Sequence, residues 1–320
     1  MVEGHLSQYK DSVDKRNLPI SKPYRRIRCN SAQAWKPCKR GVYLYSIVRY
    51  TRELFDLASL IRNLVTHREL IRSMTWRDFN ARYRGSFGGL FWSFVQPLVM
   101  MIIYTVVFSL FLKLRFSTDD SPFTFSVYLL CGLLPWTALS DGLTQSTGLI
   151  RSNVNLVKRV VFPLEILSIN LVLAATIQQV IGFVLLIPLA WLVAGQLHWT
   201  LLFLPVILAL QLLLTIGLNW ITTSLAVYLP DLQQFISLVL SVWMFLTPIF
   251  YPEEVVPPQF RILLQLNPMA HLVTYYRRVL LAGQLSSPTA FVGALSFCLL
   301  VFMFGYFWFM HTKKGFSDVL

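Results

Sequence analysis

Six long stretches of this sequence are almost free of charge. They cover residues 87–112, 123–149, 164–194, 199–228, 232–251 and 289–311, and only Asp141 and Glu165 carry a charge inside them. A helix needs about 20 predominantly apolar residues to cross the hydrocarbon core of a bilayer, and each stretch reaches that length. The sequence therefore predicts an all-α polytopic membrane protein with six transmembrane helices, which form one domain over residues 87–320.

Charge is scarce and is concentrated at one end of the chain. Only 13% of the residues are charged, against roughly 25% in a soluble domain. The net charge is +13, and +11 of it lies in the first 86 residues. This distribution excludes a soluble enzyme and a uniform nucleic-acid binder. The first twenty residues contain no apolar segment, so we expect no secretory signal and an N-terminus that stays on the side of synthesis.

The basic front end divides into two parts. Residues 1–42 have no apolar periodicity and are expected to form a mobile tail whose charge suits an anionic membrane surface, a solvated extension without a role being the alternative. Residues 43–86 are expected to form cytoplasmic amphipathic helices at the membrane interface. Thr66 and Glu69 have the spacing of a capping box, which predicts that the second helix starts there and runs to Arg84. The apolar face of the first helix consists of Ile47, Tyr50, Leu54, Leu57, Ile61 and Leu64.

Basic residues near the ends of the spans predict the orientation of the chain. Ten of them lie on the side of the N-terminus and five on the other side, so we expect both termini in the cytoplasm. The connection between the fifth and sixth spans, residues 252–287, is too apolar for an exposed loop and is broken by prolines. We expect two short re-entrant helices there, near 260–266 and 269–281, with their backbone groups satisfied inside the protein. An external loop lying on the surface is the alternative.

Motifs for enzymatic chemistry are missing from the sequence. It has no GxxxxGK[ST] loop for ATP phosphates, no HExxH pair and no GxSxG turn, and its five histidines and four cysteines are scattered. We therefore expect no catalytic residue and no metal site. Asp141 is a charge in the middle of a predicted span, which makes it a functional candidate by default. We find no basic partner for it at span depth and favour a structural role, with a hydrogen bond to Ser140, Thr144 or a neighbouring helix.

Five short motifs follow one another in the region from residue 69 to residue 314. They are RDFNARYRGS at 77–86, GLLPW at 132–136, NLVKRVVFP at 155–163, TPIFYP at 247–252 and NPM at 267–269. With these motifs in this order the chain resembles the type-2 ABC transporter permeases. Within them it is most similar to the polysaccharide exporters of the O-antigen and teichoic-acid type.

The resemblance implies a half-transporter that is not itself an enzyme. Two copies would pair to form a homodimer around a channel, and a separate ATP-binding-cassette subunit would supply ATP hydrolysis with Mg. The substrate would be a glycan linked to polyprenyl diphosphate, of O-antigen (lipopolysaccharide), teichoic-acid or capsule type, exported across the bacterial cytoplasmic (inner) membrane. An ABC exporter of a small lipid or drug, or a polytopic membrane enzyme or scaffold, remains an alternative.

The resemblance also implies roles for particular residues. A coupling helix that contacts the ATPase would contain Asn153, Asn155, Leu156, Lys158, Arg159 and Phe162. A gate or interface helix near the lipid headgroups would contain Arg72, Arg77, Asp78, Arg82 and Tyr83. An outer re-entrant gate would contain Pro252, Arg261, Asn267, Pro268 and Arg277. A sugar chain needs aromatic faces and polar donors, so the candidate channel-lining residues are Trp92, Gln96, Tyr104, Phe108, Trp136, Ser140, Trp243, Phe245 and Tyr251.

Overall fold

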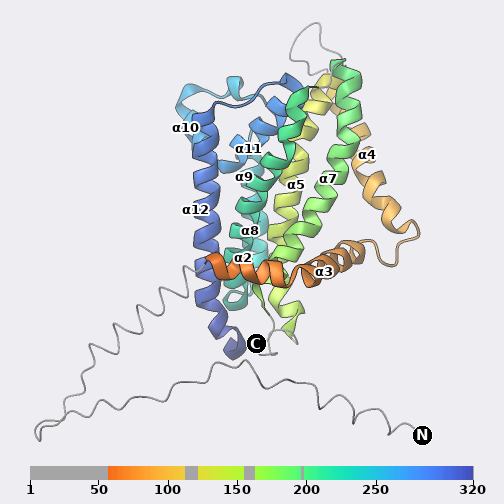
Figure 1. Cartoon of the computed structure of the whole chain (residues 1–320). Coiled ribbons are helices and arrows are strands. Elements are labelled where there is room, and N and C mark those ends of the chain that lie inside the picture. The colour runs from red at the N-terminus through yellow and green to blue at the C-terminus, as the bar shows by residue number, and fades with distance from the viewer. Residues whose placement is uncertain (1–56, 112–121, 155–162, 196–197, 320) are drawn as a thin grey trace, which may run out of the picture. The chain divides into compact units, whose positions relative to one another are not determined.

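The computed structural model describes residues 57–111, 122–154, 163–195 and 198–319, which belong to one compact unit of the chain. The predicted tail 1–42, the helical stretch 43–56 and most of the predicted coupling helix lie outside the described residues. Within the described ranges the regular structure consists of helices, and no strand occurs among them. The predicted all-α fold class is therefore confirmed (Figure 1).

Among the residues that the structure describes, four helical segments are long and apolar enough to cross a membrane, judged by length and composition. They are Gly89–Phe108, Glu165–Leu192, Trp199–Tyr228 and Pro288–Gly315. The first segment contains η1 (Gly89–Phe91), α4 (Trp92–Tyr104) and part of η2 (Thr105–Phe111), and the second lies in α7 (Glu165–Ala194). The third consists of η3 (Trp199–Phe203) and α8 (Leu204–Tyr228), and the fourth consists of α12 (Pro288–Thr312) and η7 (Lys313–Gly315). These four match four of the six predicted spans and indicate a multi-pass membrane protein.

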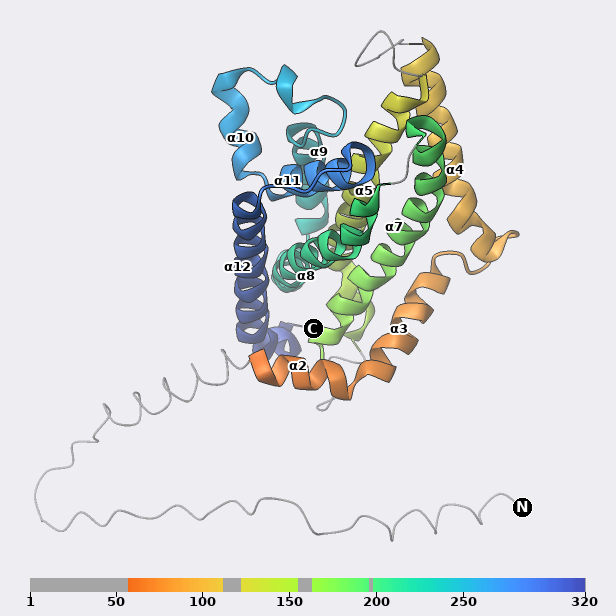
Figure 2. The ribbon, with the colours of Figure 1, turned by 45° about the horizontal axis from the view of Figure 1, so that its top comes forward.

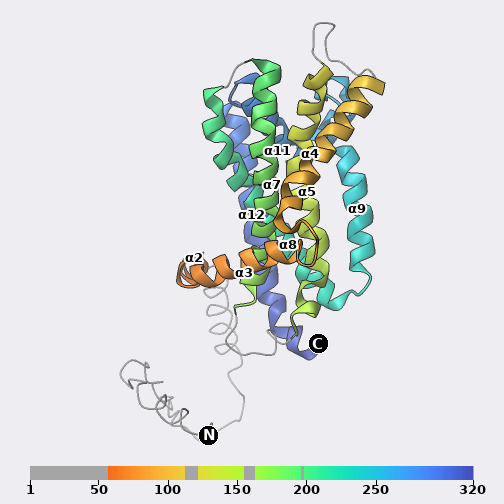
Figure 3. The ribbon, with the colours of Figure 1, turned by 90° about the vertical axis from the view of Figure 1, so that its right-hand side faces the viewer.

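The other two predicted spans are also helical, but each differs from these four in one respect. Helix α5 (Pro122–Ser152) has 31 residues and is less apolar, whereas α9 (Leu232–Leu246) is apolar but has only 15 residues. At about 1.5 Å per residue, α9 is roughly 22 Å long and so falls short of a hydrocarbon core of about 30 Å. Both helices run alongside the spanning helices (Figures 1 and 3).

The connection between α9 and α12 is broken into short helices, as its prolines predict. Helices α10 (Arg261–Leu266) and α11 (Pro268–Arg277) follow the short turns η4 (Glu253–Val255) and η5 (Pro258–Phe260). The π-helical turn η6 (Arg278–Ala282) continues α11, so the pair lies within two residues of the two expected helices. Figure 2 shows α10 and α11 at the end of the bundle opposite α2 (Leu57–Thr66) and α3 (Arg68–Ala81).

Helices α8 and α12 form the closest pair in the bundle, because a glycine on each allows their backbones to touch. A Cβ atom added at Gly305 would lie 2.1 Å from the carbonyl oxygen of Gly217, and one added at Gly217 would lie 2.6 Å from that of Val301. Small residues drive helix packing in membranes in this way, since apolar side chains gain little from leaving lipid. Beside this crossing the buried Trp220 packs its ring on Phe302 and on other aromatics of α12.

Helices α2 and α3 lie across one end of the bundle (Figure 3). The capping-box prediction is wrong: Thr66 is the last residue of α2, and His67 is the N-cap of α3 without a side-chain cap bond. On α2 the buried apolar residue is Leu60, which is 2% exposed, whereas Ile61 of the predicted face is 60% exposed. Leu64 of the predicted face packs against the same core as Leu60, so tertiary packing keeps part of the predicted face and leaves Ile61 uncovered.

Helix α3 ends at Ala81 rather than at Arg84, and a turn follows it. Gly85 in this turn has φ of +87°, a left-handed conformation that glycine adopts without steric cost. The chain can therefore reverse from α3 into α4. Helix α4 then runs along α7 at the edge of the bundle (Figure 2). Most of its large apolar side chains are uncovered: Phe94, Leu98, Val99, Met100, Ile102 and Ile103.

Candidate functional site

A cavity of about 330 Å³ lies between α4, α5 and α7, next to the turn that follows α3. Its walls differ in polarity. The polar part of the lining consists of Arg82, Tyr83, Gln96, Thr137, Asp141, Gln178 and Gln179. The apolar part consists of Pro97, Met100, Met101, Tyr104, Leu130, Leu133, Leu134, Ala138, Ala175 and Gly182. The cavity brings together two predicted gate residues, Arg82 and Tyr83, and two predicted channel residues, Gln96 and Tyr104.

Asp141 forms an ion pair with Arg82 in the wall of this cavity. The Nη1 atom of Arg82 lies 3.4 Å from Oδ2 of Asp141, and the side chains are 17% and 51% exposed respectively. No basic partner was expected at span depth, and Arg82 indeed lies outside the spans. The partner of Asp141 comes from the turn after α3, so a search along the spans alone could not find it. Ser140 instead donates its hydroxyl to the carbonyl of Thr137 at 3.1 Å.

The guanidinium of Arg82 is only partly satisfied. Its second terminal nitrogen, Nη2, is buried and has no hydrogen-bond partner among the described residues. A buried donor that lacks an acceptor costs roughly 1–3 kcal/mol, and more when the group is charged. Arg82 thus brings a positive charge to the wall of the cavity, and its covered Nη2 atom keeps a donor that its surroundings do not use.

Tyr83 and Gln178 connect the turn after α3 to α7 and α4. The hydroxyl of Tyr83 donates to Oε1 of Gln178, and Nε2 of Gln178 donates to the carbonyl of Ser93 at 3.0 Å. Burial raises the pKa of Tyr83 above its ordinary value; Arg82 lowers this pKa and Asp141 raises it further. The phenol therefore remains a neutral donor at physiological pH.

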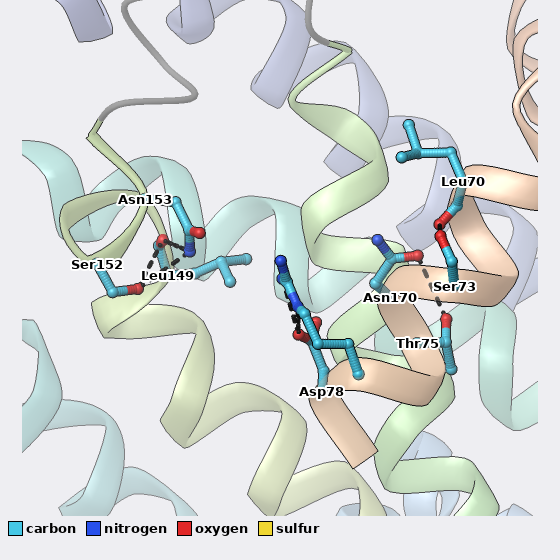
Figure 4. A network of polar contacts seen from close by, with 9 residues as sticks. Leu70, Ser73, Thr75, Asp78, Leu149, Ser152, Asn153 and Asn170 are labelled. Carbon is cyan, nitrogen blue, oxygen red and sulfur yellow. Dashed lines mark hydrogen bonds and ion pairs between the residues drawn. The ribbon is translucent and has the colours of Figure 1, made fainter. Parts of the chain in front are cut away.

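Helix α3 is fixed to α7 by one buried polar contact. The hydroxyl of Thr75 donates to Oδ1 of Asn170 at 3.3 Å, and Figure 4 shows the two side chains facing each other. Arg77 and Asp78 form a local ion pair at 2.9 Å on the exposed side of the helix. Arg72 is likewise exposed. Of the five predicted gate residues, only Arg82 and Tyr83 therefore reach the cavity.

A buried amide network lies behind the cavity and was missed by the sequence analysis. Gln179 and Gln211 donate to each other's side-chain oxygens at 2.8 and 2.9 Å, and Gln211 also donates to the carbonyl of Pro135 at 3.0 Å. The hydroxyl of Tyr276 donates to Oε1 of Gln211 at 2.7 Å. The feature of the sequence that indicates this network is the presence of two glutamines, Gln179 and Gln211, inside long apolar stretches. Each must find a partner in a low-dielectric interior, and here they hold α7, α8, α5 and α11 together.

Arg277 lies inside the protein, although it was counted among the basic residues of an external connection. It is 7% exposed and donates to the carbonyls of Pro248 and Ile249 at 2.5 and 2.7 Å. It also donates to the hydroxyl of Tyr128 at 2.8 Å, and its guanidinium carbon lies 3.5 Å from the centre of that ring. A Cβ atom at Gly132 would lie 3.1 Å from Nη2, so the glycine provides the space for this side chain.

Asn267 forms a second junction beside Arg277. Its side-chain oxygen accepts from the backbone nitrogen of Met269 at 3.0 Å, which caps α11, and from Nε1 of Trp243 at 2.9 Å. Its amide nitrogen donates to the hydroxyl of Thr247 at 3.0 Å. The motifs GLLPW, TPIFYP and NPM therefore meet at one place in the fold, where Arg277 and Asn267 satisfy the backbone beyond the end of α9.

A family model described as ABC-2 type transporter matches residues 69–281. The chain belongs to the ABC-2 type transporter family. It is 32% identical over 250 residues to the O-antigen export system permease protein RfbA of Myxococcus xanthus, an alignment that covers 75% of this chain and 92% of the relative.

Two further relatives of this ABC-2 transporter are more distant. The O-antigen export system permease protein RfbA of Klebsiella pneumoniae is 26% identical over 228 residues, covering 68% of this chain and 82% of the relative. The polysialic acid transport protein KpsM of Escherichia coli is 26% identical over 238 residues, covering 73% and 90% respectively. The resemblance inferred from the motifs is confirmed. The family match runs from α3 to η6 and includes both the cavity and the Arg277 junction.

The structure divides the candidate channel residues of this ABC-2 transporter into three groups. Gln96 and Tyr104 line the cavity. Phe108, Trp136 and Trp243 pack inside the bundle, where the two tryptophan rings meet edge to face at 5.7 Å. Trp92 and Phe245 are exposed; Ser140 and Tyr251 are partly exposed, and the hydroxyl of Tyr251 donates to the carbonyl of Phe245 at 2.8 Å.

The remaining predicted residues of the transporter lie at its two ends. Asn153 donates to the carbonyl of Leu149 at 2.9 Å and thereby closes the end of α5 (Figure 4). The other predicted coupling residues, Asn155, Leu156, Lys158, Arg159 and Phe162, lie outside the described residues. In the predicted outer gate, Pro252 precedes η4, Pro268 is the first residue of α11, and the exposed Arg261 donates to the carbonyl of Val256 at 3.3 Å.

Proposed function

We propose that this ABC-2 transporter is the permease subunit of an ATP-driven exporter that moves a lipid-linked polysaccharide across the bacterial cytoplasmic (inner) membrane. One observation carries the substrate class: the relatives above are named as O-antigen export permeases or as a polysialic acid transport protein. The alignment with the first of them spans 92% of that protein, so the likeness extends over nearly its whole length.

The proposed subunit crosses the membrane six times. The additional crossings are α5, whose 31 residues correspond to roughly 46 Å of helix, and α9 together with the residues that follow it. Both termini then lie in the cytoplasm, in agreement with the distribution of basic residues. Helices α10 and α11 re-enter the outer half of the bilayer, and the Arg277 junction supports this because it satisfies interrupted backbone inside the protein.

The complete exporter contains two copies of this chain and two copies of an ATP-binding-cassette subunit. The uncovered apolar sides of α4 and α9 support pairing with a second copy around the polysaccharide pathway. ATP and Mg bind to the ATPase subunit, because this sequence has no phosphate-binding loop. Residues 153–162 contact it through Lys158 and Arg159.

An exporter of a small lipid or drug is the second candidate function. The cavity between α4, α5 and α7 favours it, since about 330 Å³ with a polar and an apolar side suits a small amphiphile. A long glycan cannot be enclosed in that space. The two functions differ in which compound stimulates ATP hydrolysis by the assembled transporter.

The test uses the chain purified with its ATPase partner in lipid nanodiscs. ATP hydrolysis is measured with a polyprenyl-diphosphate-linked glycan, with the same lipid lacking the glycan, and with unrelated amphiphilic dyes. Stimulation that requires the glycan supports the proposed function. Equal stimulation by the dyes contradicts it and favours the small-amphiphile exporter, as does a failure of every lipid-linked glycan to change the rate. An ATPase partner with an inactive nucleotide site gives the background rate.

A further inference from the structure

We propose that the cavity between α4, α5 and α7 binds the lipid end of the exported substrate, which presupposes the export function above. The phosphate group lies at Arg82, and the first carbons of the apolar chain lie in the deep part of the cavity. The sugar remains outside it. Nothing in the names of the relatives assigns a role to this cavity.

Arg82 has a hydrogen-bond donor that the described part of the protein does not use. A guanidinium has five N–H donors; Asp141 accepts from Nη1 across a long 3.4 Å contact, while Nη2 is buried without a partner among the described residues. Arginine binds phosphate through paired parallel hydrogen bonds, so phosphate oxygens would satisfy this covered donor once the guanidinium turns it toward the cavity. Tyr83 adds a neutral hydroxyl beside the same position.

The negative charge of Asp141 repels an anion beside Arg82 but does not prevent the anion from binding. Its side chain is 51% exposed, so the carboxylate can turn toward water when a phosphate takes its position on Arg82. The ion pair keeps the guanidinium in place when the cavity is empty, and a bound phosphate would replace the carboxylate with another anionic acceptor. Removal of the Asp141 charge should therefore strengthen binding of an anion.

The polarity and size of the cavity suit the phosphate end of a lipid. Beyond Arg82 and Tyr83 its walls become apolar, with Met101 and Leu133 on one side and Ala175 on another. A volume of about 330 Å³ lies at the lower end of the range for small-molecule sites, roughly 300–1,000 Å³. It accommodates a phosphate-bearing head and a few branched carbons. A free phosphate would leave the apolar walls without a ligand.

The position of α4 gives the cavity access from the lipid. A second hollow of about 430 Å³ lies against α4. Four of its lining residues also line the first cavity: Arg82, Tyr83, Gln96 and Met100. These four side chains therefore stand between the two spaces. Because α4 packs along α7 and leaves most of its large apolar side chains uncovered, a lipid can approach Arg82 from the bilayer without crossing the bundle.

The test measures binding of farnesyl diphosphate to the full-length chain with its ATPase partner in nanodiscs of neutral lipid. Farnesol lacks the phosphate, and inorganic diphosphate lacks the chain. We expect farnesyl diphosphate to bind at least tenfold more tightly than either, since each provides only half of the contacts. Equal binding of inorganic diphosphate would identify a simple anion site, and equal binding of farnesol a simple apolar pocket; either overturns the proposal. Equal competition by phosphatidylglycerol would identify a site for bulk membrane lipid and would also overturn it.

Three variants locate the site. We expect Arg82→Gln to weaken binding about tenfold or more, while Arg84→Gln in the same turn, exposed and absent from the cavity lining, changes it little. Ala175→Leu, which fills the apolar part, should weaken binding of farnesyl diphosphate. Asp141→Asn should tighten it, an effect that a misfolded protein cannot produce. Unchanged binding in Arg82→Gln, or weaker binding in Asp141→Asn, overturns the proposal.

Failure of this site and failure of the export function give different results. If a lipid-linked glycan stimulates ATP hydrolysis equally in the wild type and in Arg82→Gln, the export function stands and the site is wrong. If no glycan stimulates the wild type while farnesyl diphosphate binds as expected, the site stands and the proposed export function is wrong.

Discussion

Arg277 on α11 holds its Nη2 atom 2.7 Å from the carbonyl oxygen of Ile249, beyond the end of α9. The same guanidinium contacts Tyr128 of α5 through the hydroxyl and the ring face. One cation thus joins α11 to α5 and to the turn after α9, and among the described residues it has no carboxylate partner within ion-pair distance. Carbonyl dipoles and an aromatic ring stabilise its charge instead.

Replacement of this cation should destabilise the outer end of the bundle. We expect Arg277→Gln to lower the free energy of unfolding by ~2–5 kcal/mol, because buried carbonyls lose their donor. Thermal unfolding in detergent measures the loss. Arg278→Gln is the matched control, since Arg278 is the exposed neighbour. Equal melting temperatures for the two variants would show that the junction contributes nothing.

The crossing of α8 and α12 should tolerate no side chain. We expect Gly305→Val to prevent close packing and to lower stability by more than ~3 kcal/mol, since the added atoms would meet backbone rather than a movable side chain. Gly293→Ala on the same helix is the control, because a Cβ there meets nothing within 4 Å. Size-exclusion profiles and unfolding temperatures distinguish the two. A well-folded Gly305→Val protein would refute the predicted contact.

Glu165 and Lys313 should behave as a coupled pair. Lys313 Nζ lies 2.9 Å from Oε2 of Glu165, which is buried at the start of α7. Lys313→Met leaves the carboxylate without its partner and should cost ~1–3 kcal/mol, a figure reduced because the lysine is partly exposed. The double variant Glu165→Gln, Lys313→Met should lose less than the sum of the two single losses. Additive losses in unfolding measurements would show no coupling.

Lys158 and Arg159 test the contact with the ATPase. We expect Lys158→Glu with Arg159→Glu to separate the two subunits or to uncouple them, since loss of an interfacial charge pair costs ~2–5 kcal/mol. Insertion and pairing of the permease should persist. The measurement is co-purification of the ATPase together with glycan export. Normal recovery and normal export would mean that these residues only determine membrane orientation.

Labelling from outside the cell tests the re-entrant helices. Single cysteines, placed on a cysteine-free background, should react weakly at Leu263 and Leu280 and strongly at Glu253 and Ser286. Lipid and protein shield the first two positions if α10 and α11 enter the bilayer. Uniformly strong reaction at all four positions would indicate an ordinary external loop.

Sequence periodicity and the motifs determined the helical content, four of the spans, the short helices α10 and α11, and the transporter family. These features depend on local properties: apolar length, the missing N–H of proline, and the capping side chain of Asn267. Each of these properties can be recognised from a short stretch of neighbouring residues in the chain.

Only the tertiary structure decided which charges and glycines matter. Arg82 meets Asp141 across 59 positions of sequence, Arg277 meets Tyr128 across 149, and Gly217 faces Gly305 on another helix. No periodicity links such pairs. Their energies depend on burial and on the direction of each side chain, and both are fixed only when the helices pack together.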